Sequence, residues 1–526
     1  MASSITLAIT LAILALILAF VRSRMHRRRT RTQGLPLPPG PRPLPLIGNI
    51  LDLPRIKPWR RYTEWCLQYG GLVYLHGPGM SLLIVNDAEI AVELLDKHSA
   101  ETSDRPQLPI LDLSGQDLNF AFFSYGERWR RYRRQFWQHF HHAAVSSYRG
   151  VQQTGVYRFL GRLLESQAQL TLNIGLSFQG TMLKVVYGLD IVDEHDKRLS
   201  IASAALDALV QSTPGHFAIE VFPFLRYVPA WFPGAGFQHT LAHSKAATLK
   251  LKYELFTAAK EIAARAGSNP CLATDLLTRA EHDGDSASTA EDETIAQEVC
   301  LVAVEGSADT TSWTLEGFFV AMSLYPEVQK KAQEELDSVV GPNRLPDHDD
   351  SDSLVYVNAL LKECLRWHVV APVALPHRTT ADIELRGYFI PKGTTITVNT
   401  WRMLHDPEVY DDPEEFRPER FIKDNEMDPA AKHPEAIAFG FGRRICPGRH
   451  FALASLFINI ASLLHVFDIT PPLDENGQPI RVKYEMSHGI TSRPEDCRCN
   501  IKPRSATAEA LIREAQRAAD AAGGEI

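Results

Sequence analysis

The stretch AFGFGRRICPGRHFALASLFINIASLL, residues 438–464, places one cysteine in a glycine-rich turn ahead of an apolar segment. Gly442 and Gly448 let the backbone turn on either side of Cys446, and the residues after Pro447 predict an apolar helix. Such a turn can shield a thiolate from solvent and supply it with backbone hydrogen bonds, as a thiolate metal ligand requires. A lone cysteine before a helix is more often a buried structural thiol, so the turn alone leaves both interpretations open.

The same stretch resembles the haem-binding signature of the cytochrome P450 family. Phe439, Gly442, Arg444, Cys446 and Gly448 match that signature at every fixed position. The resemblance implies heme b as the cofactor, with Cys446 as the thiolate ligand to iron, Arg444 on a propionate and Phe439 against the thiolate side of the ring. It also assigns Gly442 and Gly448 to the cofactor-binding turn. Five matching positions favour a metal ligand over a structural thiol.

A second signature is a polar patch, EGSADTT at residues 305–311, inside an apolar helical run. Alone, such a patch is more often a satisfied set of polar side chains than a catalytic group. The resemblance implies that Thr310 and Asp309 are catalytic and deliver protons to oxygen. Gly306 and Ser307 stand where the family usually has alanine and glycine. Because both residues are small, we expect a groove for oxygen beside this helix.

Glu305 is an unusual charge next to the expected oxygen groove. In a regular helix it lies about 140° around the axis from Thr310 and faces away, whereas a local bulge would rotate it inward. Two interpretations stay open. Glu305 is either a structural carboxylate paired elsewhere, which we favour, or a substrate contact.

Glu363 and Arg366 lie three residues apart in YVNALLKECLRW and share one face of a predicted helix. By itself this spacing predicts a surface ion pair. The resemblance adds Arg420, from FRPERF, as the third member of a buried structural network that supports the haem-binding loop. Such a network costs about as much in desolvation as it gains in attraction, so we expect it to specify the fold.

Three further residues resemble positions that contact the haem propionates in the family. Trp129 and Arg133 stand four residues apart in YGERWRRYRRQF, and His377 precedes a predicted small sheet. The resemblance assigns all three to cofactor binding. A basic aromatic helix is otherwise most often a solvated face, and this one could also receive an acidic redox partner. A lone histidine is otherwise most often structural.

The chain begins with an uncharged run at residues 5–21, which is followed by arginines from Arg22 to Arg31. As a helix the run is about 25 Å long, enough to cross a thin bilayer once. Charges after the run, without a cleavage site, favour a single-pass anchor over a cleaved signal sequence and place the catalytic domain in the cytosol. We expect an anchor with its basic flank at residues 1–24 and a basic, proline-rich hinge at residues 25–50. This order resembles microsomal members of the family, which implies the endoplasmic reticulum membrane.

Beyond the hinge, residues 51–504 predict a mainly α fold with small β-sheets, as in the cytochrome P450 fold. Strand-like runs at 71–87 come first, and an acidic stretch at 281–293 predicts an exposed loop. Residues 505–526 form a charged tail whose alanine and charge content favours a frayed helix. The net charge of −8 argues against nucleic acid as a partner. Seven scattered cysteines argue against a disulfide framework.

The resemblance implies a monooxygenase that inserts one atom of O2 into a lipophilic small molecule. Its electrons would come from NADPH through a separate cytochrome P450 reductase, because no flavin or dinucleotide segment is visible in the chain. Residues 222–237 are rich in aromatic side chains and could dip into the membrane or line a substrate entrance. They resemble filamentous-fungal members, many of which act on secondary metabolites, such as terpenoids, polyketides and aromatic compounds, or on xenobiotics. Two alternatives remain: a reductase-independent isomerase or dehydratase of the same fold, and a non-catalytic haem-binding protein.

Overall fold

The computed structural model describes residues 32, 34–166, 169–212, 217–220, 222–265, 271–283 and 286–523. The expected membrane anchor and the first part of the hinge lie outside these residues. Within the described ranges, one helix, α18 (Arg449–Val466), is long and apolar enough to cross a membrane, but 72% of it is buried inside the protein. It begins three residues after Cys446, so it is the apolar helix that the sequence predicts.

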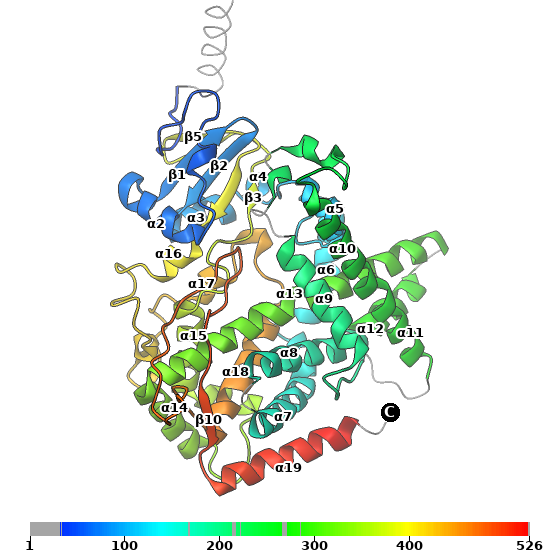
Figure 1. Ribbon diagram of the computed structural model, residues 1–526, viewed down its shortest axis with the longest axis vertical. Helices are drawn as coiled ribbons and strands as arrows, with labels where there is room; N and C mark the ends of the chain where they lie inside the picture. The colour runs from blue at the N-terminus through cyan, green and yellow to red at the C-terminus, as the bar shows by residue number, and fades with distance from the viewer. Residues whose placement is uncertain are drawn as a thin grey trace, which may run out of the picture.

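Helices make up most of the fold and the sheets are small, as predicted (Figure 1). Besides α18, the helices are α2 (Pro58–Tyr69), α3 (Ala88–Val92), α4 (Ser99–Thr102), α5 (Pro109–Ser114), α6 (Glu127–Phe140), α7 (Arg149–Glu165), α8 (Leu170–Tyr187), α9 (Lys197–Gln211), α10 (Gly236–Lys250), α11 (Phe256–Ala263), α12 (Leu272–Asp283), α13 (Ser286–Leu324), α14 (Pro326–Val339), α15 (Val355–Trp367), α16 (Thr400–Leu404), α17 (Glu435–Ala438) and α19 (Ala506–Gly523).

The largest sheet has the strand order β1-β2-β6-β3. Its strands are β1 (Leu72–Gly77), β2 (Met80–Val85), β6 (Thr395–Val398) and β3 (His377–Arg378). The pairs β1/β2 and β6/β3 are antiparallel, and β2/β6 is parallel. Three two-stranded sheets pair β4 (Ile383–Leu385) with β5 (Tyr388–Ile390), β7 (Ile422–Lys423) with β8 (Glu426–Met427), and β9 (Phe467–Thr470) with β10 (Asn500–Pro503). The large sheet therefore joins the N-terminal strands to the segment that carries His377.

The long helix α13 lies in the middle of the molecule and packs against α8, α12, α15 and α18 (Figure 1). Its polar patch does not interrupt the helix, because the hydroxyl groups donate hydrogen bonds to carbonyl groups one turn earlier. Ser307 bonds to Ala303 and Thr310 to Gly306 in this way. The predicted patch thus sits in a regular helix, without a bulge near Glu305.

One prediction about an irregular segment is wrong, and the tail is a helix that packs on the core instead of a frayed one. The acidic stretch at residues 281–293, predicted as an exposed loop, is helical on both sides of residues 284–285. The charged tail is the helix α19, which lies along α7 (Figure 1). Its alanine and isoleucine side chains fall on one face and are buried, so it belongs to the packed core: Ala508, Ile512, Ala515 and Ala519.

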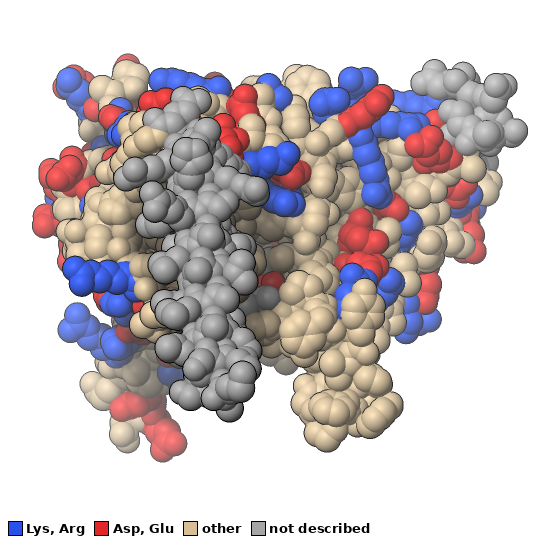
Figure 2. Space-filling model, turned by 90° about the horizontal axis from the view of Figure 1, so that it is seen from above, with Lys and Arg blue, Asp and Glu red and all other residues tan. Residues whose placement is uncertain are grey.

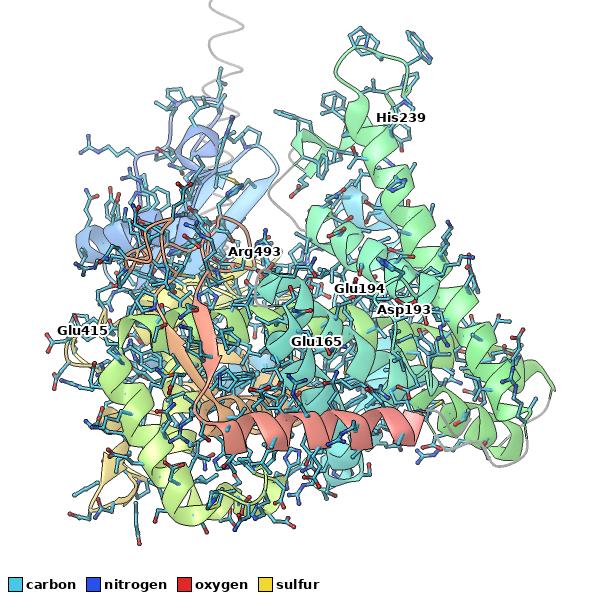
Figure 3. The ribbon with its side chains drawn as sticks, turned by 60° about the horizontal axis from the view of Figure 1, so that its bottom comes forward. Glu165, Asp193, Glu194, His239, Glu415 and Arg493 are labelled. Carbon is cyan, nitrogen blue, oxygen red and sulfur yellow. The ribbon has the colours of Figure 1, made fainter. Side chains whose placement is uncertain are left out.

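The predicted ionic network is assembled in the structure. Glu363 Oε2 lies 2.7 Å from Arg366 Nε, and Glu363 Oε1 lies 3.1 Å from Arg420 Nε. Arg366 also donates to the carbonyl group of Glu415, a residue labelled in Figure 3, at 3.0 Å. Glu363 and Arg366 are fully buried. The network therefore ties α15 to the chain that leads into the cysteine turn.

Candidate functional site

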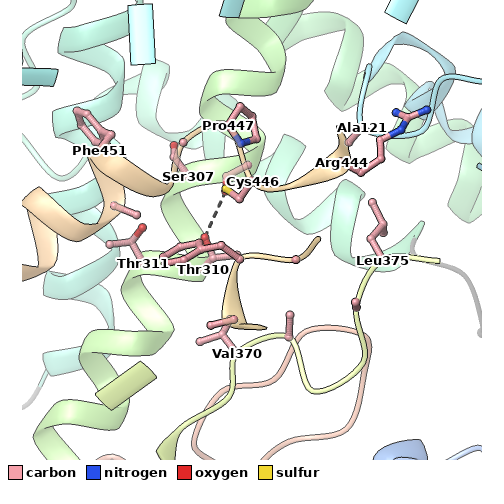
Figure 4. A pocket seen from close by; sticks show the side chains of 18 of the residues that line it. Ala121, Ser307, Thr310, Thr311, Val370, Leu375, Arg444, Cys446, Pro447 and Phe451 are labelled. Atoms are coloured by element: carbon pink, nitrogen blue, oxygen red, sulfur yellow. Dashed lines mark hydrogen bonds between the residues drawn. The ribbon is translucent and has the colours of Figure 1, made fainter. Parts of the chain in front are cut away.

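A cavity of about 340 Å³ lies between α13 and the turn that carries Cys446. Figure 4 shows Ser307, Thr310 and Thr311 on the helix and Cys446 on the turn, all lining this space. Of the site residues that the sequence predicts, eight line the cavity: Trp129, Arg133, Thr310, His377, Phe439, Arg444, Cys446 and Gly448. Gly442, Asp309 and Glu305 are not among the lining residues.

The turn around Cys446 is held by its backbone. The N–H of Cys446 donates to the carbonyl of Phe439 at 2.8 Å. Gly442 has φ +55°, and a Cβ there would lie 2.1 Å from the carbonyl oxygen of Leu95, so only glycine fits. Burial raises the pKa of the Cys446 thiol, while the N–H groups of Gly448 and Arg449 and the charge of Arg133 lower it. These donors favour the thiolate, and a bound metal ion would remove the proton outright.

Gly448 does not supply backbone freedom, in contrast to the prediction. Its φ is −90°, which any residue adopts, and it precedes the first residue of α18. Its contribution is space. A Cβ on Gly448, on Gly440 or on Gly306 across the cavity would meet no atom within 4 Å. The turn and α13 thus leave room between them for a large flat group such as haem.

Arg133 and Arg444 line the cavity, Arg444 as a buried side chain and Arg133 as a half-buried one. Arg444 donates to the carbonyls of Ser103 at 2.8 Å and Phe123 at 2.6 Å, and its Nη1 is buried without a partner. Burial lowers the pKa of both guanidinium groups to about 10. In the described part of the chain neither forms an ion pair with a carboxylate. A ligand with carboxylate groups, as the haem propionates are, fits this place.

Trp129 and His377 complete this end of the cavity. The Arg444 guanidinium lies 4.4 Å from the centre of the Trp129 ring, a cation–π contact. His377 Nδ1 lies 2.9 Å from the carbonyl oxygen of Thr102, so Nδ1 carries the proton. Burial, followed by the charge of Arg105, lowers the pKa of His377, which keeps the ring neutral until an anion is bound.

Arg105 is a lining residue that the sequence analysis missed. Its Nη1 donates to the carbonyls of Leu375 and Pro376, each at 2.7 Å, and its Nε donates to Ala121 at 3.0 Å. Burial and the nearby Arg444 lower its pKa. An arginine before a proline carries no sequence sign of burial, so only the fold reveals it.

Thr310 and Asp309 point to different places. Thr310 faces the cavity, and its Oγ1 donates to the carbonyl of Gly306 at 3.2 Å. Asp309 is on the neighbouring face of α13. Burial and the Asp207 carboxylate raise the pKa of Asp309 to about 6, and Arg493 opposes that shift. The structure therefore places only the hydroxyl group of this pair at the cavity.

Glu305 lies on the side of α13 away from the cavity. Its carboxylate accepts hydrogen bonds from Gln116 Nε2 at 3.2 Å and Asn119 Nδ2 at 2.9 Å. Because α13 has no bulge here, the side chain is not rotated inward. This is the arrangement of a structural carboxylate paired elsewhere, and it gives no support to a direct substrate contact.

Comparison with known proteins supports the same conclusion. The cytochrome P450 family model matches residues 38–495. The cytochrome P450 monooxygenase COX2 of Coprinopsis cinerea is 40% identical over 89% of this chain and 90% of its own length. COX1 of the same fungus is 38% identical over 94% of this chain and 96% of its own length. The tryptamine 4-monooxygenase of Psilocybe cyanescens is 34% identical over 91% and 94%, respectively.

Family proteins bind haem through a cysteine thiolate, and the cavity contains one cysteine, Cys446, among its lining residues. The glycine-lined space and the unpaired arginines fit that cofactor. This chain belongs to the cytochrome P450 family and is a haem-thiolate monooxygenase.

Proposed function

We propose that this protein oxidises neutral, lipophilic small molecules at a haem ligated by Cys446, with electrons from NADPH through a separate reductase. The observation that carries the proposal is the composition of the cavity wall. Apolar side chains dominate it, and its charged side chains are three arginines, Arg105, Arg133 and Arg444. When bound, the haem supplies activation of O2, so that one oxygen atom enters the substrate and the other becomes water.

The charge of the cavity favours a neutral substrate. No carboxylate is among the lining residues in the described part of the chain. With the three arginines paired to the haem propionates, an ammonium group of a substrate would find no carboxylate side chain in the cavity wall as its counter-charge, which is unfavourable in a buried site. The relative from Psilocybe cyanescens acts on tryptamine by its name, but this cavity favours uncharged terpenoid, polyketide or aromatic compounds.

The lining residues have separate tasks in this proposal. Cys446 would supply the thiolate to the haem iron, and Arg105, Arg133, Arg444 and neutral His377 would hold the propionates. Phe439 would pack against the haem on the cysteine side, and Trp129 holds the Arg444 guanidinium in place.

Thr310 and Asp309 move protons in this proposal. The Thr310 hydroxyl donates to the carbonyl of Gly306, so its lone pairs are free to accept a hydrogen bond from a water molecule in the cavity and hold that water in place. With a pKa of about 6, the Asp309 carboxyl can hold a proton near neutral pH and release it to water beside Thr310.

An apolar edge of the molecule supports membrane attachment. Figures 1 and 3 show the first described residues and the loop before α10 at the same end of the protein, with His239 labelled where α10 begins. Seen from that end, a projection of uncharged side chains stands beside a hollow (Figure 2). Large apolar side chains are exposed in both segments: Leu44, Leu46, Leu51, Ile56, Phe224, Tyr227, Trp231 and Phe232. With the uncharged run at residues 5–21, this edge fits the endoplasmic reticulum membrane, with the catalytic domain in the cytosol.

A basic face of α6 suits an acidic reductase. Arg130 and Arg134 are exposed on this helix, and no ion pair to either is found among the described residues. The inner side of the same helix carries Trp129 and Arg133, which line the cavity. A partner docked on α6 would therefore deliver electrons close to the cofactor.

The test is reconstitution with NADPH-cytochrome P450 reductase and isotope-labelled O2. We expect NADPH consumption and one labelled oxygen atom per product with neutral sesquiterpenes or aromatic compounds, and little turnover of tryptamine. Product without NADPH would indicate the isomerase or dehydratase alternative. A haem protein that never consumes NADPH across this panel would indicate the non-catalytic alternative.

A further inference from the structure

Glu305 is a buried carboxylate on α13 that the mechanism above does not use. Its side chain is 3% exposed, and its two oxygens accept hydrogen bonds from the amides of Gln116 and Asn119. Within the described part of the chain, no arginine, lysine or histidine forms an ion pair with it. Burial raises the pKa of Glu305 to about 7, while the two amides lower it. Because burial of a carboxylate is unfavourable, its only compensation comes from the two amides.

Those two amides belong to the segment that forms a wall of the cavity. Asn119 Oδ1 accepts a hydrogen bond from the N–H of Ala121 at 3.0 Å, so the contact made by Glu305 continues into the backbone. Phe120 and Ala121 both line the cavity. Glu305 therefore fixes the amide side chain of Asn119, and Asn119 in turn fixes the backbone of the cavity wall at Ala121.

The same wall is held at its other end by the arginines of the cofactor site. Arg105 Nε donates to the carbonyl of Ala121 at 3.0 Å, and Arg444 Nη2 donates to the carbonyl of Phe123 at 2.6 Å. Ala121 is thus bound through its N–H on the Glu305 side and through its carbonyl on the Arg105 side. Loss of either anchor would let residues 119–123 shift while the other end stays fixed.

Gln116 extends the contact to a third element. Its Nε2 also lies 3.4 Å from Thr248 Oγ1 on α10. Gly115, with φ +82°, brings the chain so close to α10 that a Cβ would lie 3.3 Å from Lys245 Cγ. The carboxylate of Glu305 is therefore where α13, α10 and the cavity wall are joined by polar contacts.

We propose that Glu305 is a positioning residue that sets the place of the cavity wall at Phe120 and Ala121 through Asn119, and so decides which ligands fit. It acts without touching the ligand. This inference rests on the proposed function, because it takes the cavity as the place where substrate binds above the haem.

The test uses two nitrogen ligands of different size, imidazole and phenylimidazole, titrated optically against the haem of the full-length holoenzyme. Asn119→Asp removes the amide donor and places a second carboxyl group against Glu305, so the hydrogen bond that fixes the wall is lost and the two groups repel each other unless they share a proton. We expect the Kd of phenylimidazole to change by about tenfold, the size of one buried hydrogen bond to a charged group. The Kd of imidazole should change by less than about twofold, because a small ligand does not reach the wall.

The double variant Asn119→Asp with Glu305→Gln restores the hydrogen bond between the two positions, with the donor now at position 305 and the acceptor at position 119. Gln at 305 can donate to the new carboxylate and still accept from Gln116. We expect it to bind phenylimidazole nearly as the wild type does. Gln116→Met, which removes one donor and keeps the length of the side chain, gives a second variant with a smaller shift of the same kind. Glu316→Gln is the control, since Glu316 is equally buried on α13 and has no hydrogen bond to the wall.

Equal shifts for the two ligands, no shift, or no recovery in the double variant would overturn the inference while the enzyme remains a haem protein. A wild-type protein that gives no spectral change with either ligand would instead overturn the proposed function, and the inference with it.

Discussion

Three arginine side chains, the buried Arg105 and Arg444 and the half-buried Arg133, converge on one cavity from segments far apart in the chain. Their charges repel one another: after burial, Arg444 and Arg133 lower the pKa of Arg105, and Arg133 lowers the pKa of Arg444. Such a cluster is unfavourable in an empty protein and favourable beside bound carboxylates. At the scale of single residues, the cofactor is therefore recognised by charge as well as by the cysteine.

Replacement of Arg105 tests this recognition. Arg105→Gln keeps a hydrogen-bond donor but removes the charge, so we expect haem affinity to fall by about 2 kcal/mol, roughly thirtyfold. The ratio of haem to protein after dialysis against apomyoglobin measures the effect. Arg130→Gln, an exposed arginine on α6, is the matched control and should retain its haem. Equal retention in the two variants would refute the role of Arg105.

Thr310 and Thr294 make the same local hydrogen bond, since each donates to the carbonyl four residues earlier on α13. Only Thr310 lines the cavity. Thr310→Ala should therefore lower product formed per NADPH by about tenfold or more, because proton delivery is lost, and leave haem content unchanged. Thr294→Ala should change neither quantity. Coupled turnover in Thr310→Ala would exclude the hydroxyl group from proton delivery.

At the scale of elements, the sequence predicted those parts whose function is local. The cysteine turn and the polar patch of α13 each carry their chemistry within about ten residues, so their patterns are readable. Arg105 and the amide partners of Glu305 depend on contacts across more than a hundred residues, which no local pattern encodes. That the side chain of Asp309 points to a different face of α13 from Thr310 was predictable, because adjacent residues on a helix lie about 100° apart around its axis.

The cysteine turn offers a test of close packing. In Gly442→Ala the new Cβ would meet the carbonyl of Leu95, whereas in Gly477→Ala it would meet nothing within 4 Å at a similar positive φ. We expect Gly477→Ala to lose about 1 kcal/mol and Gly442→Ala clearly more, together with haem. Urea unfolding and haem content measure the two losses. Equal destabilisation of the two variants would mean that the backbone near Leu95 can shift to make room for the new Cβ.

At the scale of the whole molecule, buried polar groups link the layers. Glu363, Arg366 and Arg420 were predicted as a set because the family resemblance supplied the third member; the spacing of the first two predicted only a surface pair. The acidic stretch before α13 was predicted as a loop because its composition resembles one, yet it extends a long helix. Composition alone does not separate an exposed helix from an exposed loop.

Buried neutral histidines make the stability of the whole fold depend on pH. Burial, followed by the charge of Arg366, lowers the pKa of His405 to about 3, against about 6.5 in an unfolded chain. As the pH falls the unfolded chain binds the proton first, so stability is complete above pH 6.5 and is lost below it. Between about pH 7.5 and 5.5, the wild type should lose about 1.4 kcal/mol more than His405→Gln does. Urea unfolding at the two pH values measures the difference, and parallel losses would contradict the buried neutral state.

The central claim is that Cys446 is the thiolate ligand of a haem in this cavity. The most direct test is the difference spectrum of the reduced protein with carbon monoxide, recorded for the wild type and for Cys446→Ser. We expect the wild type to show the long-wavelength Soret band of a thiolate-ligated haem, the band that names the family, and the variant to lose it while remaining folded by circular dichroism. A wild type without haem, or a variant with an unchanged band, would contradict the claim.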